Sequence, residues 1–165
     1  MKHFLLLIAI AIAGGLEAQV NKVSLEASGL TCSMCSNAIL KSLKTLDCID
    51  KIVPDMTNYT FEITFKAGSE VDFNKIKSKV EDAGFSVSGF VAAIWFEKIT
   101  LKEAVPIRVG NNDLYFVNSA GRSLSGIHMV KVLDKGFVPA KEYRRSPFSN
   151  LQIGTGAYHV SLTGL

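Results

Sequence analysis

The sequence has little of what marks several large protein classes. It contains three cysteines, four prolines and one tryptophan among 165 residues, and its net charge at pH 7 is only +3. Nucleic acids and anionic membranes select strongly basic patches, so this charge indicates neither as a partner. No internal repeat or low-complexity tract is visible. A chain of this length forms one ordinary domain or two small ones.

Long apolar runs are also missing. The apolar run from Phe4 to Ala13 is too short to cross a bilayer, because a spanning helix needs about 20 apolar residues. Lys2 and His3 precede this run, and Leu16-Glu17-Ala18 follows it, which is typical of a secretory signal peptide. We expect residues 1–18 to be a signal peptide. The cleaved protein would then be secreted or periplasmic and would have no membrane span. A membrane anchor is the alternative.

Residue sets typical of enzymes are absent from the sequence pattern. We find no Ser-His-Asp set, no paired carboxylates and no phosphate-binding loop, which are the arrangements that support hydrolysis or phosphoryl transfer. The sequence therefore predicts a binding protein and not an enzyme.

Two of the few cysteines stand at an informative place. Cys32 and Cys35 follow a run in which Val23, Leu25 and Ala27 alternate with polar residues, a pattern typical of a strand. The chain after them has apolar residues at helical spacing: Ile39, Leu40, Leu43 and Leu46. We therefore place Cys32 in a loop and Cys35 in or near the first turn of a helix, where unpaired backbone N–H groups favour a thiolate.

The segment Gly-Leu-Thr-Cys-Ser-Met-Cys at residues 29–35 resembles the metal-binding motif of the heavy-metal-associated domain. This family includes copper chaperones, the N-terminal modules of copper-transporting ATPases and periplasmic mercury-binding proteins. Leu30 departs from the usual Gly-Met-Thr-Cys-x-x-Cys, but Leu and Met have similar volumes. The segment ending in Gly84-Phe85 resembles the end of the family's second helix. The resemblance covers roughly Val23 to Val91, and residues after Ile94 show none.

The residues and the resemblance together suggest a metal site. We expect Cys32 and Cys35 to be the ligands, Gly29 to allow a tight loop path, Thr31 to order the loop and Phe85 to shield it. Soft thiolates select soft ions. Two thiolates on a loop suit Cu(I), and Hg(II) wants the same geometry. Zn(II) is a poorer candidate, because structural zinc takes four ligands.

This site predicts a carrier. A surface loop with two protein ligands leaves the ion open to a partner's thiolates, so we expect Cu(I) transfer or sequestration and, as partner, an envelope metal-transport protein. A mercury scavenger is the alternative within the metal class. Thiol–disulfide exchange is a further alternative, because Cys-x-x-Cys at a helix start is also a redox arrangement. Leu30-Thr31 stands where redox proteins have an aromatic residue.

Other candidate ligands have ordinary structural interpretations. Cys48 is predicted to lie at the far end of the first helix, about 16 Å from the motif at 1.5 Å per residue, as a small apolar residue; an intermolecular disulfide is the alternative. His128, Met129 and His159 suggest a second copper site, but His128 and Met129 point to opposite faces of a strand.

The hydrophobic pattern predicts an α+β fold. Residues 19–93 read as strand, helix, strand, strand, helix, strand, which is a ferredoxin-like unit, and the resemblance implies the same fold. Residues 94–165 read as short strands with turns between them. We expect a small all-β domain there, a barrel or a sandwich, with an oligonucleotide/oligosaccharide-binding-type barrel as one candidate. Pro139 to Asn150 reads as a polar loop.

Overall fold

The computed structural model describes residues 18–30, 33–149, 151 and 153–163. The predicted signal peptide lies almost wholly outside these residues. The elements in chain order are β1 (Gln19–Ser28), α1 (Ser33–Leu43), β2 (Ile49–Asp55), β3 (Thr60–Phe65), α2 (Phe73–Asp82), β4 (Ser86–Thr100), β5 (Ile107–Val109), β6 (Asn112–Phe116), β7 (Ser123–Val132), α3 (Ala140–Arg145) and β8 (Ala157–Thr163).

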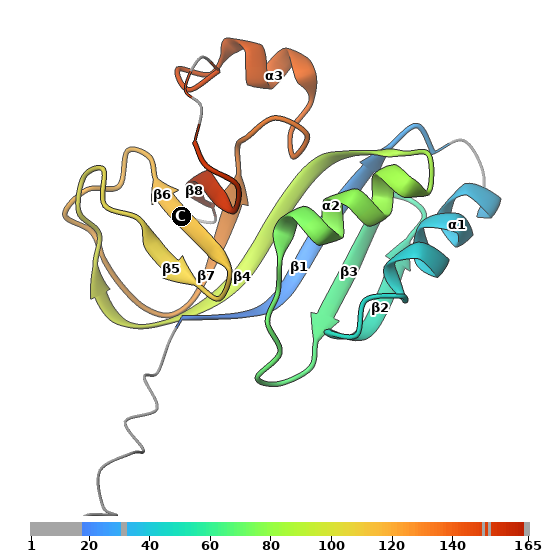
Figure 1. Cartoon of the computed structure of the whole chain (residues 1–165), viewed down its shortest axis with the longest axis horizontal. Helices are drawn as coiled ribbons and strands as arrows, with labels where there is room; N and C mark the ends of the chain where they lie inside the picture. The colour runs from blue at the N-terminus through green and yellow to red at the C-terminus, as the bar shows by residue number, and fades with distance from the viewer. Residues whose placement is uncertain (1–17, 31–32, 150, 152, 164–165) are drawn as a thin grey trace, which may run out of the picture.

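The strands form one sheet of eight in the order β2-β3-β1-β4-β7-β8-β6-β5. The first six elements give the predicted ferredoxin-like order, and α1 and α2 cover one face of their strands (Figure 1). The apolar residues of these strands face the helices. Val23, Leu25 and Ala27 of β1 are buried, as predicted from their alternation. The fold class of this half is confirmed.

The second helix begins and ends at residues that the sequence marks. The side chain of Asp72 accepts a hydrogen bond from the Lys75 N–H at 3.1 Å, which caps the first turn. The Gly84 backbone has a φ of +88°, the left-handed conformation that glycine adopts without a Cβ penalty. The buried face of α2 consists of Phe73, Ile76 and Val80.

The β-rich second half is confirmed, but its strands do not form a separate sheet. The predicted boundary between residues 93 and 94 lies inside β4, which runs unbroken for 15 residues, about 50 Å at 3.3 Å per residue. Residues Val91–Trp95 of β4 pair with both β1 and β7. No glycine, proline or other turn signal interrupts the segment from Val91 to Phe96, which is why the sequence shows no clear end there.

Two details differ from the expectations for the second half. The segment predicted as a polar loop contains the short helix α3, and none of its residues is buried, so no apolar periodicity marked it. Strands β6 and β8 pair in parallel, with Leu114 opposite Tyr158. A pattern of residues close in the chain cannot predict a pairing between strands so far apart in the sequence. Two of the predicted short strands, β5 and β6, pair as an antiparallel hairpin.

Candidate metal-binding loop

The predicted metal loop joins the end of β1 to the start of α1. Gly29 follows β1 with a φ of +87°, which turns the chain in a conformation that only glycine adopts at little cost. Thr31 and Cys32 lie outside the described residues, so their predicted roles stay predictions. Cys35 lies in the first turn of α1 and is half-buried. Backbone N–H groups of a first turn favour negative charge, and a thiolate is the form that binds soft metals.

Phe85 stands beside this loop, at the end of α2. A Cβ atom built on Gly29 would lie 3.8 Å from Cδ1 of Phe85, an ordinary van der Waals contact. The N–H of Phe85 donates to the carbonyl of Val80 at 3.2 Å, and the N–H of Gly84 donates to the carbonyl of Glu81 at 2.8 Å. These two bonds fix Phe85 to the last turn of the helix. The structure thus brings Phe85 against Gly29, from 56 residues further along the chain.

The turn between β2 and β3 lies at the same end of the sheet. The N–H of Ala27, near the end of β1, donates to the carbonyl of Tyr59 at 3.1 Å. Tyr59 is 50% exposed and Met56 is 44% exposed. No motif in the sequence marks either residue, although the predicted strand order places this turn beside the end of β1. A hydrogen bond from the Asn58 side chain, with the Thr57 N–H, holds the pKa of Asp55 below its usual value and orders the turn.

Cys48 lies away from the loop, between α1 and β2, and packs against the hydrophobic core. Burial raises the pKa of its thiol. Its carbonyl accepts hydrogen bonds from the Lys66 N–H at 2.9 Å and from the Ser69 hydroxyl at 3.3 Å. The 11 residues of α1 put about 16 Å of helix between its two ends. These contacts match the predicted structural role.

The second copper site is not assembled. His128 Nε2 lies 3.2 Å from the Ser125 carbonyl, whereas His159 is buried with its Nδ1 2.9 Å from Oδ1 of Asp134. The two histidines thus have different partners. Within the described ranges, no group of three or more His, Cys, Asp or Glu side chains is arranged to hold a metal ion.

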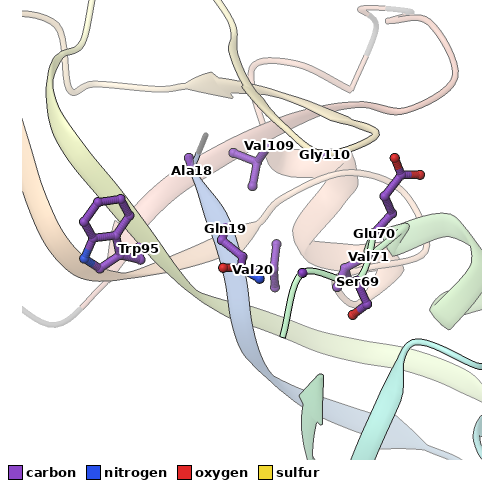
Figure 2. A pocket seen from close by; sticks show the side chains of 10 residues that line it. Ala18, Gln19, Val20, Ser69, Glu70, Val71, Trp95, Val109 and Gly110 are labelled. Atoms are coloured by element: carbon purple, nitrogen blue, oxygen red, sulfur yellow. The ribbon is translucent and has the colours of Figure 1, made fainter. Parts of the chain in front are cut away.

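Figure 2 shows a pocket of about 530 Å³ at the opposite end of β1. Ala18 just before β1, Val20 from β1, Glu70 and Val71 from the segment before α2, and Trp95 from β4 lie around it. The metal loop leaves the other end of β1 at Ser28, so this pocket is not part of the metal site.

A search of protein-family models matches residues 24–86 to the heavy-metal-associated domain. Residues 24–86 are a heavy-metal-associated domain. The match begins in β1 and ends at the start of β4, so it contains the loop, both helices and Phe85.

Part of this chain is also similar to a curated protein. The Arabidopsis thaliana protein described as "Probable copper-transporting ATPase HMA5" is 35% identical over 69 residues, which cover 42% of this chain and 7% of that protein. The chain thus spans only a small part of the length of this relative.

Two solved structures resemble the same region. The yeast copper transporter domain CCC2A, determined in apo and Cu(I)-loaded states, is 32% identical, with a TM-score of 0.36, over 39% of this chain and 88% of that domain. A copper-binding domain from HMA7, a P-type ATPase, is 26% identical, with a TM-score of 0.38, over 41% of this chain and 90% of that domain.

Among the helices of the described residues, none is long and apolar enough to cross a membrane.

Proposed function

We propose that this protein binds Cu(I) through Cys32 and Cys35 and passes it to a partner protein. The observation that carries the proposal is the heavy-metal-associated domain at residues 24–86, with a Cys-x-x-Cys motif whose second cysteine lies in the first turn of α1. The copper transport named for its Arabidopsis relative supports copper as the cargo.

The chemistry of the loop favours Cu(I) over Zn(II). Two thiolates satisfy a soft ion of low coordination number, whereas structural zinc takes four ligands. The described residues offer no further cluster of ligands. A two-coordinate ion at the surface accepts a third thiolate from a partner before it loses one of its own, so each Cu–S bond breaks only after another has formed. This sequence of steps lets the ion move without being released into water.

The apolar N-terminal segment supports export as part of this proposal. A signal peptide cleaved after Ala18 would deliver the protein to the periplasm or the exterior, and an envelope metal-transport protein is then the partner. Mass spectrometry of the secreted protein tests this directly, because it reports the N-terminal residue, the bound metal and the thiol state together. A chain that retains residues 1–18 in the cell contradicts export.

The decisive experiment is a competition titration of the reduced protein with Cu(I), Hg(II) and Zn(II). We expect one Cu(I) per chain, bound more tightly than Zn(II), and loss of binding in the Cys32→Ser, Cys35→Ser double variant. Cys48→Ser is the matched control and should bind as the unchanged protein does. Preference for Hg(II) in cells exposed to it would favour a mercury scavenger instead.

Thiol–disulfide exchange is the second candidate, because a Cys-x-x-Cys pair at a helix start also suits redox chemistry. The first turn of α1, which carries Cys35, is the observation in its favour. Insulin reduction with measurable turnover, together with weak Cu(I) binding, would replace the copper proposal with this one.

A further inference from the structure

The second half of the chain holds the N-terminus of α2. Asn112 is fully buried, and its side chain makes three hydrogen bonds. Its Oδ1 accepts from the Phe73 N–H at 3.2 Å, and its Nδ2 donates to the carbonyls of Val71 at 2.7 Å and Val109 at 3.1 Å. Asn112 thus ties the start of the helix to the β5–β6 turn. Figure 2 shows the neighbouring pocket, which Val71, Val109 and Gly110 help to line.

Aromatic rings from the second half cover the same helix. Phe73 of α2 lies 5.4 Å from Tyr158 of β8, measured between ring centroids. Phe137 lies 5.3 Å from Tyr158 and 5.3 Å from Phe90 of β4. Lys77 of α2 places its Nζ 5.5 Å from the centre of the Phe137 ring. The heavy-metal-associated domain therefore does not close its own core, because Phe137 and Tyr158 complete it.

Phe85 lies at the other end of α2. It is hydrogen-bonded to the last turn of this helix and lies against Gly29. Ten residues of α2, about 15 Å of helix, thus connect Asn112 to the metal loop. A helix of this length moves as a unit, because its backbone hydrogen bonds resist bending. Whatever fixes its first turn also fixes the position of Phe85.

We propose that the region after residue 100 acts as a brace that holds α2 in place and so positions Phe85 against Gly29, where the metal loop begins. Asn112 and Phe137 are the positioning residues. The inference rests on the proposed metal function for its biological meaning, but the positioning itself is measured on the metal-free protein.

The test measures how fast the metal-loop thiols react with iodoacetamide in the reduced, metal-free protein. All variants carry Cys48→Ser, so that only Cys32 and Cys35 react. We expect Asn112→Ala to raise the alkylation rate at least about fivefold, because local openings of a weakened element become more frequent. The neighbouring Asn111→Ala is the matched control, since Asn111 bonds the exposed Glu70 at 2.9 Å and should leave the rate unchanged.

A second comparison separates positioning from general destabilisation. Leu124 is fully buried in β7, on the far side of β4 from the helix-bearing half. Leu124→Ala should lower the unfolding temperature at least as much as Asn112→Ala and leave the alkylation rate nearly unchanged at 20 °C. Equal acceleration by the two variants at matched stability overturns the proposal.

A double-mutant cycle tests the route through Phe85. If the brace acts through this ring, Phe85→Ala should accelerate alkylation, and adding Asn112→Ala should have little further effect. If the two substitutions each multiply the alkylation rate independently, the route through Phe85 is refuted. If Asn112→Ala does not fold, Phe137→Leu removes the ring contacts without touching a hydrogen bond and enters the same cycle. Failure of the metal titration with a positive cycle would refute the proposed function and leave the brace standing.

Discussion

Replacing Gly29 by alanine tests the geometry of the metal loop most directly. The φ of +87° at this residue is one that an L-residue with a side chain adopts at a cost of roughly 1–2 kcal/mol. Space is not the obstacle, because the nearest atom to an added Cβ is Cδ1 of Phe85 at 3.8 Å. The loss therefore comes from backbone strain, and the loop relieves it only by changing its path.

The expected result has two parts. If the loop keeps its path, the free energy of unfolding falls by the strain energy, and the unfolding temperature falls by roughly 2–8 °C for a protein of this size. If the metal-free loop relaxes instead, metal binding must restore the strain, and the Cu(I) affinity falls by a factor of about 5–30. The measurements are thermal unfolding of the metal-free protein and a Cu(I) competition titration.

Gly68 provides the control for Gly29→Ala. It has a φ of +73° with no atom within 4 Å of an added Cβ, and it lies in the turn after β3, at the far end from the metal loop. Gly68→Ala should lose stability to a similar degree and keep its Cu(I) affinity. Equal loss of affinity in both variants, or no change of any kind in Gly29→Ala, would refute the reasoning.

Three further predictions follow from individual contacts. The backbone N–H of His159 donates to Oδ2 of Asp134 at 2.6 Å, and its imidazole Nδ1 lies 2.9 Å from Oδ1. Asp134→Ala leaves both groups unpaired, so the free energy of unfolding in urea should fall by about 2–3 kcal/mol; a fall under 0.5 kcal/mol would contradict the burial of this pair. Because burial raises the pKa of the Cys48 thiol, the folded state prefers the neutral form, and stability should decline as pH rises above the ordinary thiol pKa of about 8.5. Cys48→Ala should remove that part of the decline, and identical pH profiles would refute the assignment. For the same reason Cys48 should react with iodoacetamide more slowly than Cys35 at pH 8, as peptide mapping by mass spectrometry reports.

The shared strand has a consequence for how the chain unfolds. Val91–Trp95 pair with β1 on one side and β7 on the other, and Phe73, Phe90, Phe137 and Tyr158 form one aromatic cluster across the two halves. Elements that share a core unfold together. The heavy-metal-associated domain of this protein is thus built into a larger sheet.

Local sequence patterns predicted much of the first half. The alternation of Val23, Leu25 and Ala27 in β1 is a signal between residues close in the chain, and it was confirmed. The Asp72 cap and the apolar face of α2 are local signals of the same kind. The motif at residues 29–35 indicated the family for the same reason, because its residue types and spacing are read without knowledge of the fold. The place of Cys35 in a first helical turn followed from its neighbours.

The sequence by itself determined the strand and helix order of residues 19–93, the Cys-x-x-Cys motif and the existence of strands beyond it, because periodicity and spacing are properties of neighbouring residues. Only the tertiary structure decided that β4 serves both halves, that β6 and β8 run in parallel, and that Asn112 and Phe137 reach α2. The physical reason is that these contacts join residues 23 or more positions apart, where no local pattern records which surfaces meet.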